Sequence, residues 1–205
     1  AADEMALMVM RSARSSVVRE LLDFAAALCD REGRLIAQGL SLPLHLGSIP
    51  DAIQTVRRRF GENIAPGDLF ILNDPFHGGM HLPDIFMFKP IYFEDRLEGF
   101  AVVVAHHADI GGRVPGGGAA DSTEIFQEGL RIPPLKIHVA GVPDQAVYDL
   151  LQLNVRVPEI VMGDLEAQVA GCMAGEHGLQ ALLSQYGADV FSGYVGEILD
   201  YSERI

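Results

Sequence analysis

The sequence has few basic residues, few cysteines and no tryptophan. Its 15 Lys and Arg stand against 28 Asp and Glu, which gives a formal net charge of -13 at pH 7. Because phosphate binding is mainly electrostatic and requires clustered cations, this balance argues against a nucleic-acid partner. The two cysteines, Cys29 and Cys172, lie in apolar segments. We therefore expect reduced core thiols in a cytoplasmic protein, with a disulfide between them as the alternative.

Long apolar runs and phosphate-binding glycine motifs are also missing. No run reaches the length that spans a membrane and no secretion signal is present, so no membrane association is expected. No segment matches GxxxxGK[ST], which excludes a P-loop. The chain begins without Met and stops within an expected helix over 188–205. Both ends indicate a piece of a longer protein.

Histidines and acids concentrate in residues 73–112. This stretch contains four of the seven histidines, and three acids stand beside them, namely Asp74, Asp84 and Asp109. Such a concentration has no purpose in an ordinary strand end, where a single histidine usually makes one hydrogen bond. Taken as a group, the residues favour a metal site or a catalytic site.

Two apolar runs within this stretch, 85–93 and 100–105, are short and rich in aromatic and β-branched residues, which is typical of strands. The polar residues 94–96 between them predict a tight turn and hence an antiparallel hairpin. Residues paired across such a hairpin have numbers that sum to about 191. This register sets Asp84 opposite His107, so the two His/Asp clusters meet at the open end of the hairpin.

Two imidazoles and a carboxylate around one point are a ligand set for manganese, iron or zinc. His81 and Asp84 share one short loop, in which Pro83 restricts the backbone. The far strand supplies either His106 or His107. Because neighbouring residues on a strand point to opposite faces, only one of this pair is expected to reach the metal.

The rest of the chain mixes helices with strand pairs in no regular alternation. We predict an α+β fold, with antiparallel hairpins around the site and a long C-terminal helical segment. Two domains are predicted: an α+β site-bearing domain over 1–140, and a helical segment over 141–205 that packs on it or on a part beyond this chain. Helices are predicted over 2–14, over 48–60 with Ser48 as its cap, after a cap at Asp144, and from Pro158 onward as a long packing helix. A hairpin is predicted from 22–29 with 34–38, a helix being the alternative for 22–29, and a strand over 67–73. If residues 122–130 are helical, Glu124 and Glu128 are neighbours on that helix.

Several motifs resemble one known family. NDPFHGGMHLPD, AHHADIGG, QEGLRIPPLKI, RSARSSVVRELLDFAAALCDREGRLIAQG and LPLHLGSIP resemble the hydantoinase B type. That family includes N-methylhydantoinase B subunits, the matching half of 5-oxoprolinase and the alpha subunit of acetone carboxylase. The resemblance covers residues 11–202, and members are usually much longer, so the chain resembles an N-terminal portion.

The resemblance implies a set of site residues. The acetone carboxylase subunit holds manganese, and the matching positions here are Glu20, His81, Asp84 and His106. Without the resemblance, Glu20 reads as a solvated surface acid. His107 and Asp109 become groups that support the ligands or face the substrate, and candidates for a general base. Zinc and iron stay open as the metal.

The resemblance also implies an activity. A hydantoinase A-type partner subunit is expected to bind ATP and phosphorylate the substrate. Within that hetero-oligomer, this chain would hydrolyse a cyclic amide such as a hydantoin, 5-oxoproline or a related lactam. The alternatives are an ATP-dependent ketone carboxylase like acetone carboxylase, a structural subunit without metal, and a metal-binding module that needs no ATP.

Overall fold

The computed structural model describes residues 1–204, and its centre is a seven-stranded antiparallel sheet. The strand order is β2-β1-β5-β4-β3-β6-β7, and every neighbouring pair runs antiparallel. The predicted α+β class is therefore confirmed. The strands are β1 (Phe24–Asp30), β2 (Leu35–Gln38), β3 (Leu69–Leu72), β4 (Asp84–Phe93), β5 (Arg96–His106), β6 (Leu135–Val139) and β7 (Val142–Pro143).

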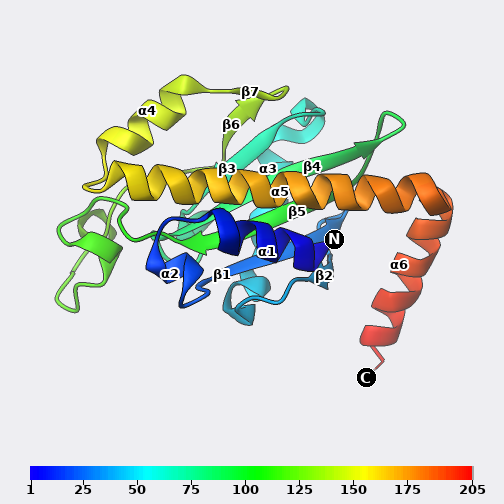
Figure 1. Cartoon of the computed structure of the whole chain (residues 1–205), viewed down its shortest axis with the longest axis horizontal. Helices are drawn as coiled ribbons and strands as arrows, with labels where there is room; N and C mark the ends of the chain where they lie inside the picture. Colours follow the sequence, from blue (N-terminus) through cyan, green and yellow to red (C-terminus); the bar gives the residue numbers. More distant parts are fainter. Residues whose placement is uncertain (205) are drawn as a thin grey trace.

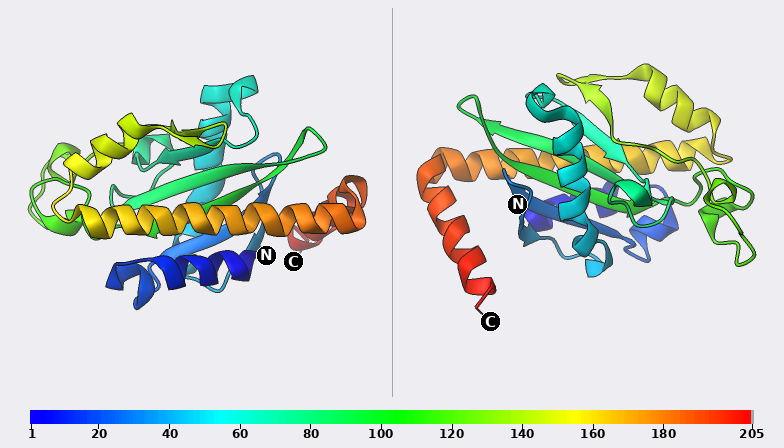
Figure 2. Two further views of the ribbon diagram at one scale, coloured as in Figure 1. Left: turned by 45° about the horizontal axis from the view of Figure 1, so that its top comes forward. Right: turned by 180° about the vertical axis from the view of Figure 1, so that it is seen from behind.

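Helices cover both faces of this sheet. On one face the long helix α5 runs along β4 and β5 with α1 beside it, and α3 lies on the opposite face (Figures 1 and 2). The α-helices are α1 (Ala2–Ser12), α2 (Ser16–Arg19), α3 (Ile49–Phe60), α4 (Gln145–Leu153), α5 (Pro158–Tyr186) and α6 (Ala188–Ser202). Short 3-10 turns are η1 (Pro43–Ser48), η2 (Gly61–Asn63), η3 (Pro75–His77), η4 (Pro115–Gly117) and η5 (Ile125–Gln127).

Strand alternation divides the buried residues into two apolar cores. Met87 on β4 and Val103 on β5 point toward α1 and α5, whereas Phe88 and Val102 belong to the core that α3 covers. Successive side chains of a strand point to opposite faces, so the near-continuous apolar runs of β4 and β5 serve both cores. The two central strands are therefore buried on both sides, and the residues at their ends are attached to well-packed strands.

The β4–β5 hairpin forms as predicted, but its register differs by one residue. Glu94 and Asp95 make the turn with φ values of 48° and 62°, the geometry of a two-residue type I′ connection. A bulge between Ile91 and Tyr92 then shifts the pairing. The turn lies one residue earlier than the expected sum of about 191 implies, and the bulge compensates for only part of this difference, so Asp84 lies opposite His106 rather than His107.

Two local predictions are corrected by the structure. Ser48 makes no side-chain cap for α3; its hydroxyl donates to the His45 carbonyl at 2.8 Å, and Pro50 occupies the first turn instead. Residues 122–130 contain only the turn η5, because Glu124 is extended with φ -151° and ψ 149°. The predicted cap Asp144 is confirmed, since its carboxylate accepts from the Ala146 N–H at 3.0 Å.

Helix α5 confirms the predicted long packing helix and shares one core with α1 and the sheet. Its seam is interrupted at Glu176, whose carboxylate lies 3.3 Å from the ammonium of Lys89 on β4. The ion pair with Lys89 therefore accommodates Glu176 within the apolar seam. The division of the chain at residue 140 stays a prediction. Within the described residues, no helix combines the length and apolar character that crossing a membrane requires.

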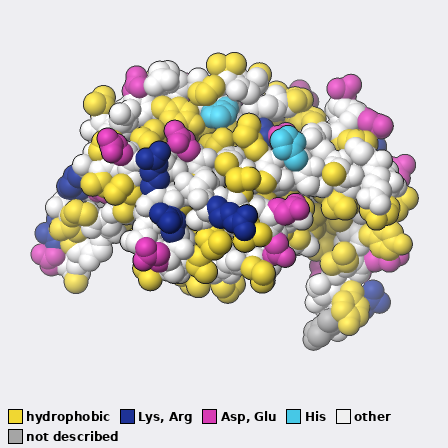
Figure 3. All heavy atoms as spheres, in the orientation of Figure 1, with side chains coloured by type: hydrophobic (Ala, Val, Ile, Leu, Met, Phe, Trp, Pro, Cys, Tyr) yellow, Lys and Arg dark blue, Asp and Glu magenta, His cyan; other side chains and the backbone are white. Residues whose placement is uncertain are grey.

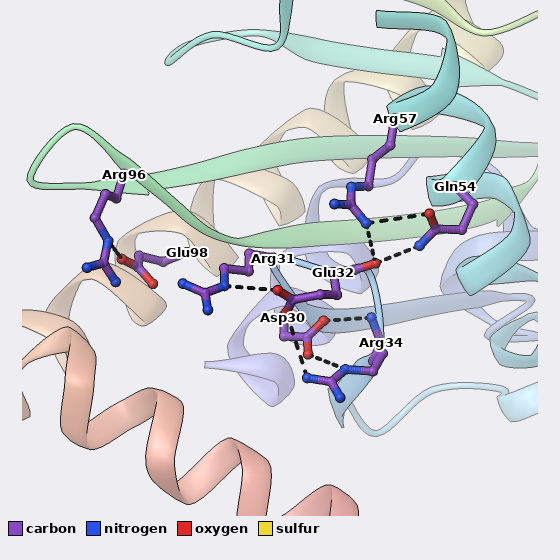
Figure 4. Close-up of polar contacts among 8 residues, drawn as sticks. All are labelled: Asp30, Arg31, Glu32, Arg34, Gln54, Arg57, Arg96 and Glu98. Carbon is purple, nitrogen blue, oxygen red and sulfur yellow. Dashed lines mark hydrogen bonds and ion pairs between the residues drawn. The ribbon is translucent and has the colours of Figure 1, made fainter. Parts of the chain in front are cut away.

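On the face that α5 covers, the charged side chains of the described residues form no continuous basic patch. Lys and Arg are interspersed there with Asp and Glu (Figure 3). Near the closed end of the hairpin, polar and charged groups tie neighbouring segments together. Arg57 and Gln54 of α3 both donate to the Glu32 carbonyl, at 2.8 and 2.6 Å, while Arg34 pairs with Asp30 (Figure 4).

Close packing of α5 against α1 leads to a stability prediction. A Cβ added at Gly171 would lie 2.5 Å from Val9 Cγ2, whereas one added at Gly193 of α6 would meet nothing within 4 Å. We expect Gly171→Ala to lower the free energy of unfolding by about 1–3 kcal/mol through overpacking. Gly193→Ala, the same chemical change, is expected to raise it by up to about 1 kcal/mol through helix propensity. Urea denaturation of both variants tests this, and equal effects would contradict the packing shown here.

Candidate metal centre

Three of the predicted ligands converge at the open end of the β4–β5 hairpin. His81, Asp84 and His106 each offer one ligand atom, and these atoms all lie within 4.8 Å of one another. His106 Nδ1 is 3.2 Å from Asp84 Oδ1, and His81 Nδ1 contacts Asp84 Oδ2. The two imidazole rings lie 5.0 Å apart between centroids. The carboxylate is therefore held between two imidazoles that come from different segments.

Backbone hydrogen bonds fix this convergence. Asp84 is the first residue of β4 and pairs directly with His106, the last residue of β5. The Asp84 N–H donates to the His81 carbonyl at 2.9 Å, which closes the loop that contains Pro83. The His107 N–H donates to the Pro83 carbonyl at 2.8 Å. The short loop and the end of β5 are thus joined by main-chain contacts that do not depend on any ligand.

Asp84 is ionised in this environment. The residue is 1% exposed, and burial by itself acts to raise the pKa of its carboxyl group. Hydrogen bonds from His106, His45 and His81 outweigh burial and hold that pKa far below its usual value. The same contact with Asp84 raises the pKa of His81. A buried carboxylate that stays charged next to imidazoles is the electrostatic setting that a cation requires.

Two further residues of the centre were not found from the sequence. His45 of η1 lies with Nε2 3.5 Å from Asp84 Oδ1 and 3.8 Å from Asp23 Oδ1. Asp23 Oδ2 is in turn 3.9 Å from His106 Nδ1. Asp23 reaches the centre because β1 pairs with β5: Phe24 lies opposite Ala105, so Asp23 lies beside His106. The partner strand of β5 on that side could not be read from the sequence.

Glu20 lies apart from the three converging ligand atoms. It follows α2, its residue is exposed, and it does not belong to the group of His81, Asp84 and His106. The carboxylate that approaches His106 from this segment is that of Asp23. The role of Glu20 as a ligand stays a prediction.

His107 occupies the opposite side of the sheet from His106, as strand alternation requires. It is completely buried, and its Nε2 donates to Gln168 Oε1 of α5 at 2.9 Å. Burial lowers the pKa of His107, which the contact with Gln168 opposes only in part. The amide of Gln168 also donates to the carbonyls of Ile85 and Val103, so it joins α5 to both central strands. His107 therefore does not face the converging ligands in this structure.

Asp109 anchors the glycine-rich loop of residues 111–120. Its carboxylate accepts from the Gly111 N–H at 3.1 Å and from Arg156 Nη1 at 2.9 Å, and Arg156 also donates to the Gly111 carbonyl at 3.3 Å. Farther along this loop, a Cβ added at Gly117 would lie 3.1 Å from Pro83 Cγ. The loop thus touches the segment that carries His81 and Asp84.

Asp74, in the loop before the centre, leads to a pH prediction. Burial acts to raise its pKa, but hydrogen bonds from His77 and the Phe76 N–H, with the Arg131 guanidinium nearby, hold it below the usual 3.8. A folded-state pKa below the unfolded one stabilises the fold above about pH 4, and this contribution is lost as pH falls through the folded value. We expect Asp74→Asn to cost about 1–2 kcal/mol at pH 7, and this difference from wild type to shrink below pH 3.8. Urea denaturation against pH tests this, with Asp149→Asn as an exposed control; a difference independent of pH would contradict it.

The donors present fit a divalent metal of the manganese, iron or zinc kind. Two imidazole nitrogens and one buried carboxylate form the group, with a second carboxylate from Asp23 at its edge. This mixture of nitrogen and oxygen donors without thiolate suits borderline metals. The His81 side chain is 51% exposed, so one side of the group is open to solvent and to a small molecule.

Comparison with known proteins places these residues in a family. The sequence profile described as Hydantoinase B/oxoprolinase matches residues 1–205. The beta subunit of the caprolactamase of Pseudomonas jessenii is 40% identical over 98% of this chain, which spans 35% of that protein. A putative D-/L-hydantoinase B subunit of Pseudomonas sp. (strain NS671) is 35% identical, again over 98% of this chain and 35% of the relative.

Solved structures agree with this placement. The ATP-dependent caprolactamase from Pseudomonas jessenii superposes with a TM-score of 0.93 at 39% identity, covering 99% of this chain and 35% of that one. An acetone carboxylase in its nucleotide-free form gives a TM-score of 0.90 at 22% identity, over 96% of this chain and 26% of that one, which shows a common fold. The chain thus spans about a third of the length of the caprolactamase and hydantoinase subunits it matches. By profile, identity and fold, it belongs to the hydantoinase B/oxoprolinase family.

Proposed function

We propose that this chain is the metal-binding portion of an ATP-dependent hydrolase of cyclic amides. The observation that carries the proposal is the convergence of His81, Asp84 and His106 at the open end of the central hairpin. The relatives give the substrate class, since their names describe a caprolactamase and a hydantoinase. Manganese is the first choice of metal, with zinc and iron as alternatives, and Glu20 or Asp23 is the proposed fourth ligand.

The residues around the centre have separable roles in this proposal. Asp84 supplies the buried negative charge, and the exposed His81 faces the side from which a lactam ring would approach. A bound metal would supply Lewis acidity, which lowers the pKa of water or polarises an amide carbonyl. Asp109 holds the glycine-rich loop through Arg156, and His107 holds the end of β5 against α5. We propose that these two act by positioning; a general-base role for either stays a prediction.

ATP is proposed to act on a separate subunit. The relatives are named as subunits, and the similar solved structure is titled an ATP-dependent caprolactamase. The missing P-loop in this chain is compatible with that division. A hydantoinase A-type partner would bind ATP and activate the amide, within a cytoplasmic hetero-oligomer. The alternative, a ketone carboxylase, has weaker support, because the likeness to acetone carboxylase at 22% identity is one of fold.

An assay of substrate-stimulated ATP turnover tests the proposal. The intact protein is combined with its ATP-binding partner and offered caprolactam, 5-oxoproline or hydantoin, and separately acetone with bicarbonate. We expect ADP release and ring-opened product with a cyclic amide alone. Stimulation only by the ketone with bicarbonate would support the carboxylase instead. Full turnover by a complex stripped of metal would favour a structural subunit, and amide hydrolysis without ATP a module that acts by itself.

A further inference from the structure

His45 is a buried imidazole beside Asp84, and the proposed function gives it no part in binding the metal. It lies in η1, between α3 and the strand ends, and is 1% exposed. Its Nε2 approaches Oδ1 of both Asp84 and Asp23, at 3.5 and 3.8 Å. Asp84 begins β4, whereas Asp23 precedes β1, and β5 with His106 lies between those two strands in the sheet. His45 therefore joins two carboxylates that no common strand pair holds together.

The other ring nitrogen indicates that this arrangement is not a matter of packing alone. His45 Nδ1 is buried and has no hydrogen-bond partner among the described residues. An unpaired buried polar atom is unfavourable, and a leucine of similar size would avoid it. Something at Nε2 must compensate, and the groups found there are the two acids. Without a donor between them, two carboxylates facing one point would repel each other.

We propose that His45 is a positioning residue that fixes the carboxylates of Asp84 and Asp23 at the spacing needed for a divalent cation, without binding the cation itself. The inference rests on the proposed metal centre. It places the Nε2–H of His45 on the side of the two acids. Removing a group that orients a metal ligand in this way commonly lowers metal affinity by about 10–100-fold.

Three variants of the intact protein separate this role from packing and from direct ligation. His45→Leu keeps the volume but removes the donor, and we expect affinity for Co²⁺ to fall by about 10–100-fold. His45→Gln keeps an N–H that reaches the same acids, and we expect affinity within about threefold of wild type. His138→Leu is the matched control, because His138 pairs with Tyr148 at 2.9 Å, apart from the converging ligands.

The readouts are Co²⁺ affinity by chelator competition and the visible absorption spectrum of the Co²⁺ protein. We expect the spectrum of His45→Gln to match wild type, and that of His45→Leu to change. Wild-type affinity in the Leu variant would overturn the inference. So would equal loss in the Leu and Gln variants, which would indicate a ligand or a purely structural ring. A wild-type protein that binds no Co²⁺ would overturn the metal centre itself and this inference with it.

Discussion

Replacing Asp84 with Asn is expected to lower the affinity of the intact protein for Mn²⁺ by more than about 100-fold. Residues that merely orient ligands contribute up to about 100-fold, so loss of the central carboxylate must cost more. Asn has nearly the same shape and retains one oxygen. The change therefore removes the charge from a site where three imidazoles surround one buried carboxylate. Isothermal titration with Mn²⁺ measures the loss directly.

The same substitution at an exposed acid provides the control. Asp121 pairs with Arg113 in the glycine-rich region, and its side chain is largely exposed. We expect Asp121→Asn to bind Mn²⁺ as wild type does, and cyclic amide hydrolysis to be lost only in Asp84→Asn. If Asp84→Asn kept its metal and its activity, Asp84 would be a buried structural acid and the site would lie elsewhere.

The second large effect, on stability, is expected from replacing Asn73, whose side chain bonds to the loop that carries His81 and Asp84. Its amide donates to the carbonyls of Leu82 and Leu130, at 2.7 and 2.9 Å, and its carbonyl accepts from the Ile132 N–H at 2.7 Å. Asn73→Leu would leave three main-chain groups without these partners, each costing about 1–3 kcal/mol. We expect the free energy of unfolding to fall by about 3–5 kcal/mol.

Urea denaturation measures this effect, with Asn154→Leu as the matched control. Asn154 also donates to a main-chain carbonyl, that of Leu150 at 2.7 Å, but it is exposed and water can replace the contact. We expect the control to change stability by less than about 1 kcal/mol. Because Leu82 follows His81, metal affinity should fall in Asn73→Leu as well. Similar destabilisation by both variants would contradict a special role for Asn73.

Hairpin prediction succeeded where local chemistry dictates structure. The β-branched and aromatic runs, separated by Glu94 and Asp95, have one compact arrangement, and it brings His81 and Asp84 toward the end of β5. Alternation along β5 also predicted that one histidine of the His106–His107 pair would lie apart from the other. The structure puts His106 beside Asp84 and His107 under α5.

The remaining parts of the centre depend on contacts between distant segments. His45 reaches Asp84 only because η1 folds over the strand ends, and no periodic pattern marks that placement. The exact position of the turn at Glu94 and Asp95 and the bulge at Ile91 together set the register one residue from the predicted one, and sequence spacing reveals neither. Residues 122–130 contain helix-forming acids, yet tertiary contacts win, since Gly129 packs directly against Ile110. The conformation of such a segment depends less on its helix propensity than on the tertiary contacts that it makes.

Metal content of the purified intact protein tests the central claim most directly. Elemental analysis is made on wild type and on the His81→Ala, Asp84→Ala double variant, both expressed with added metal. We expect about one equivalent of manganese, zinc or iron in wild type and nearly none in the variant. The element found then decides among the three metals. Equal metal in both proteins, or none in the wild-type complex with its partner, would contradict a metal centre at this end of the hairpin.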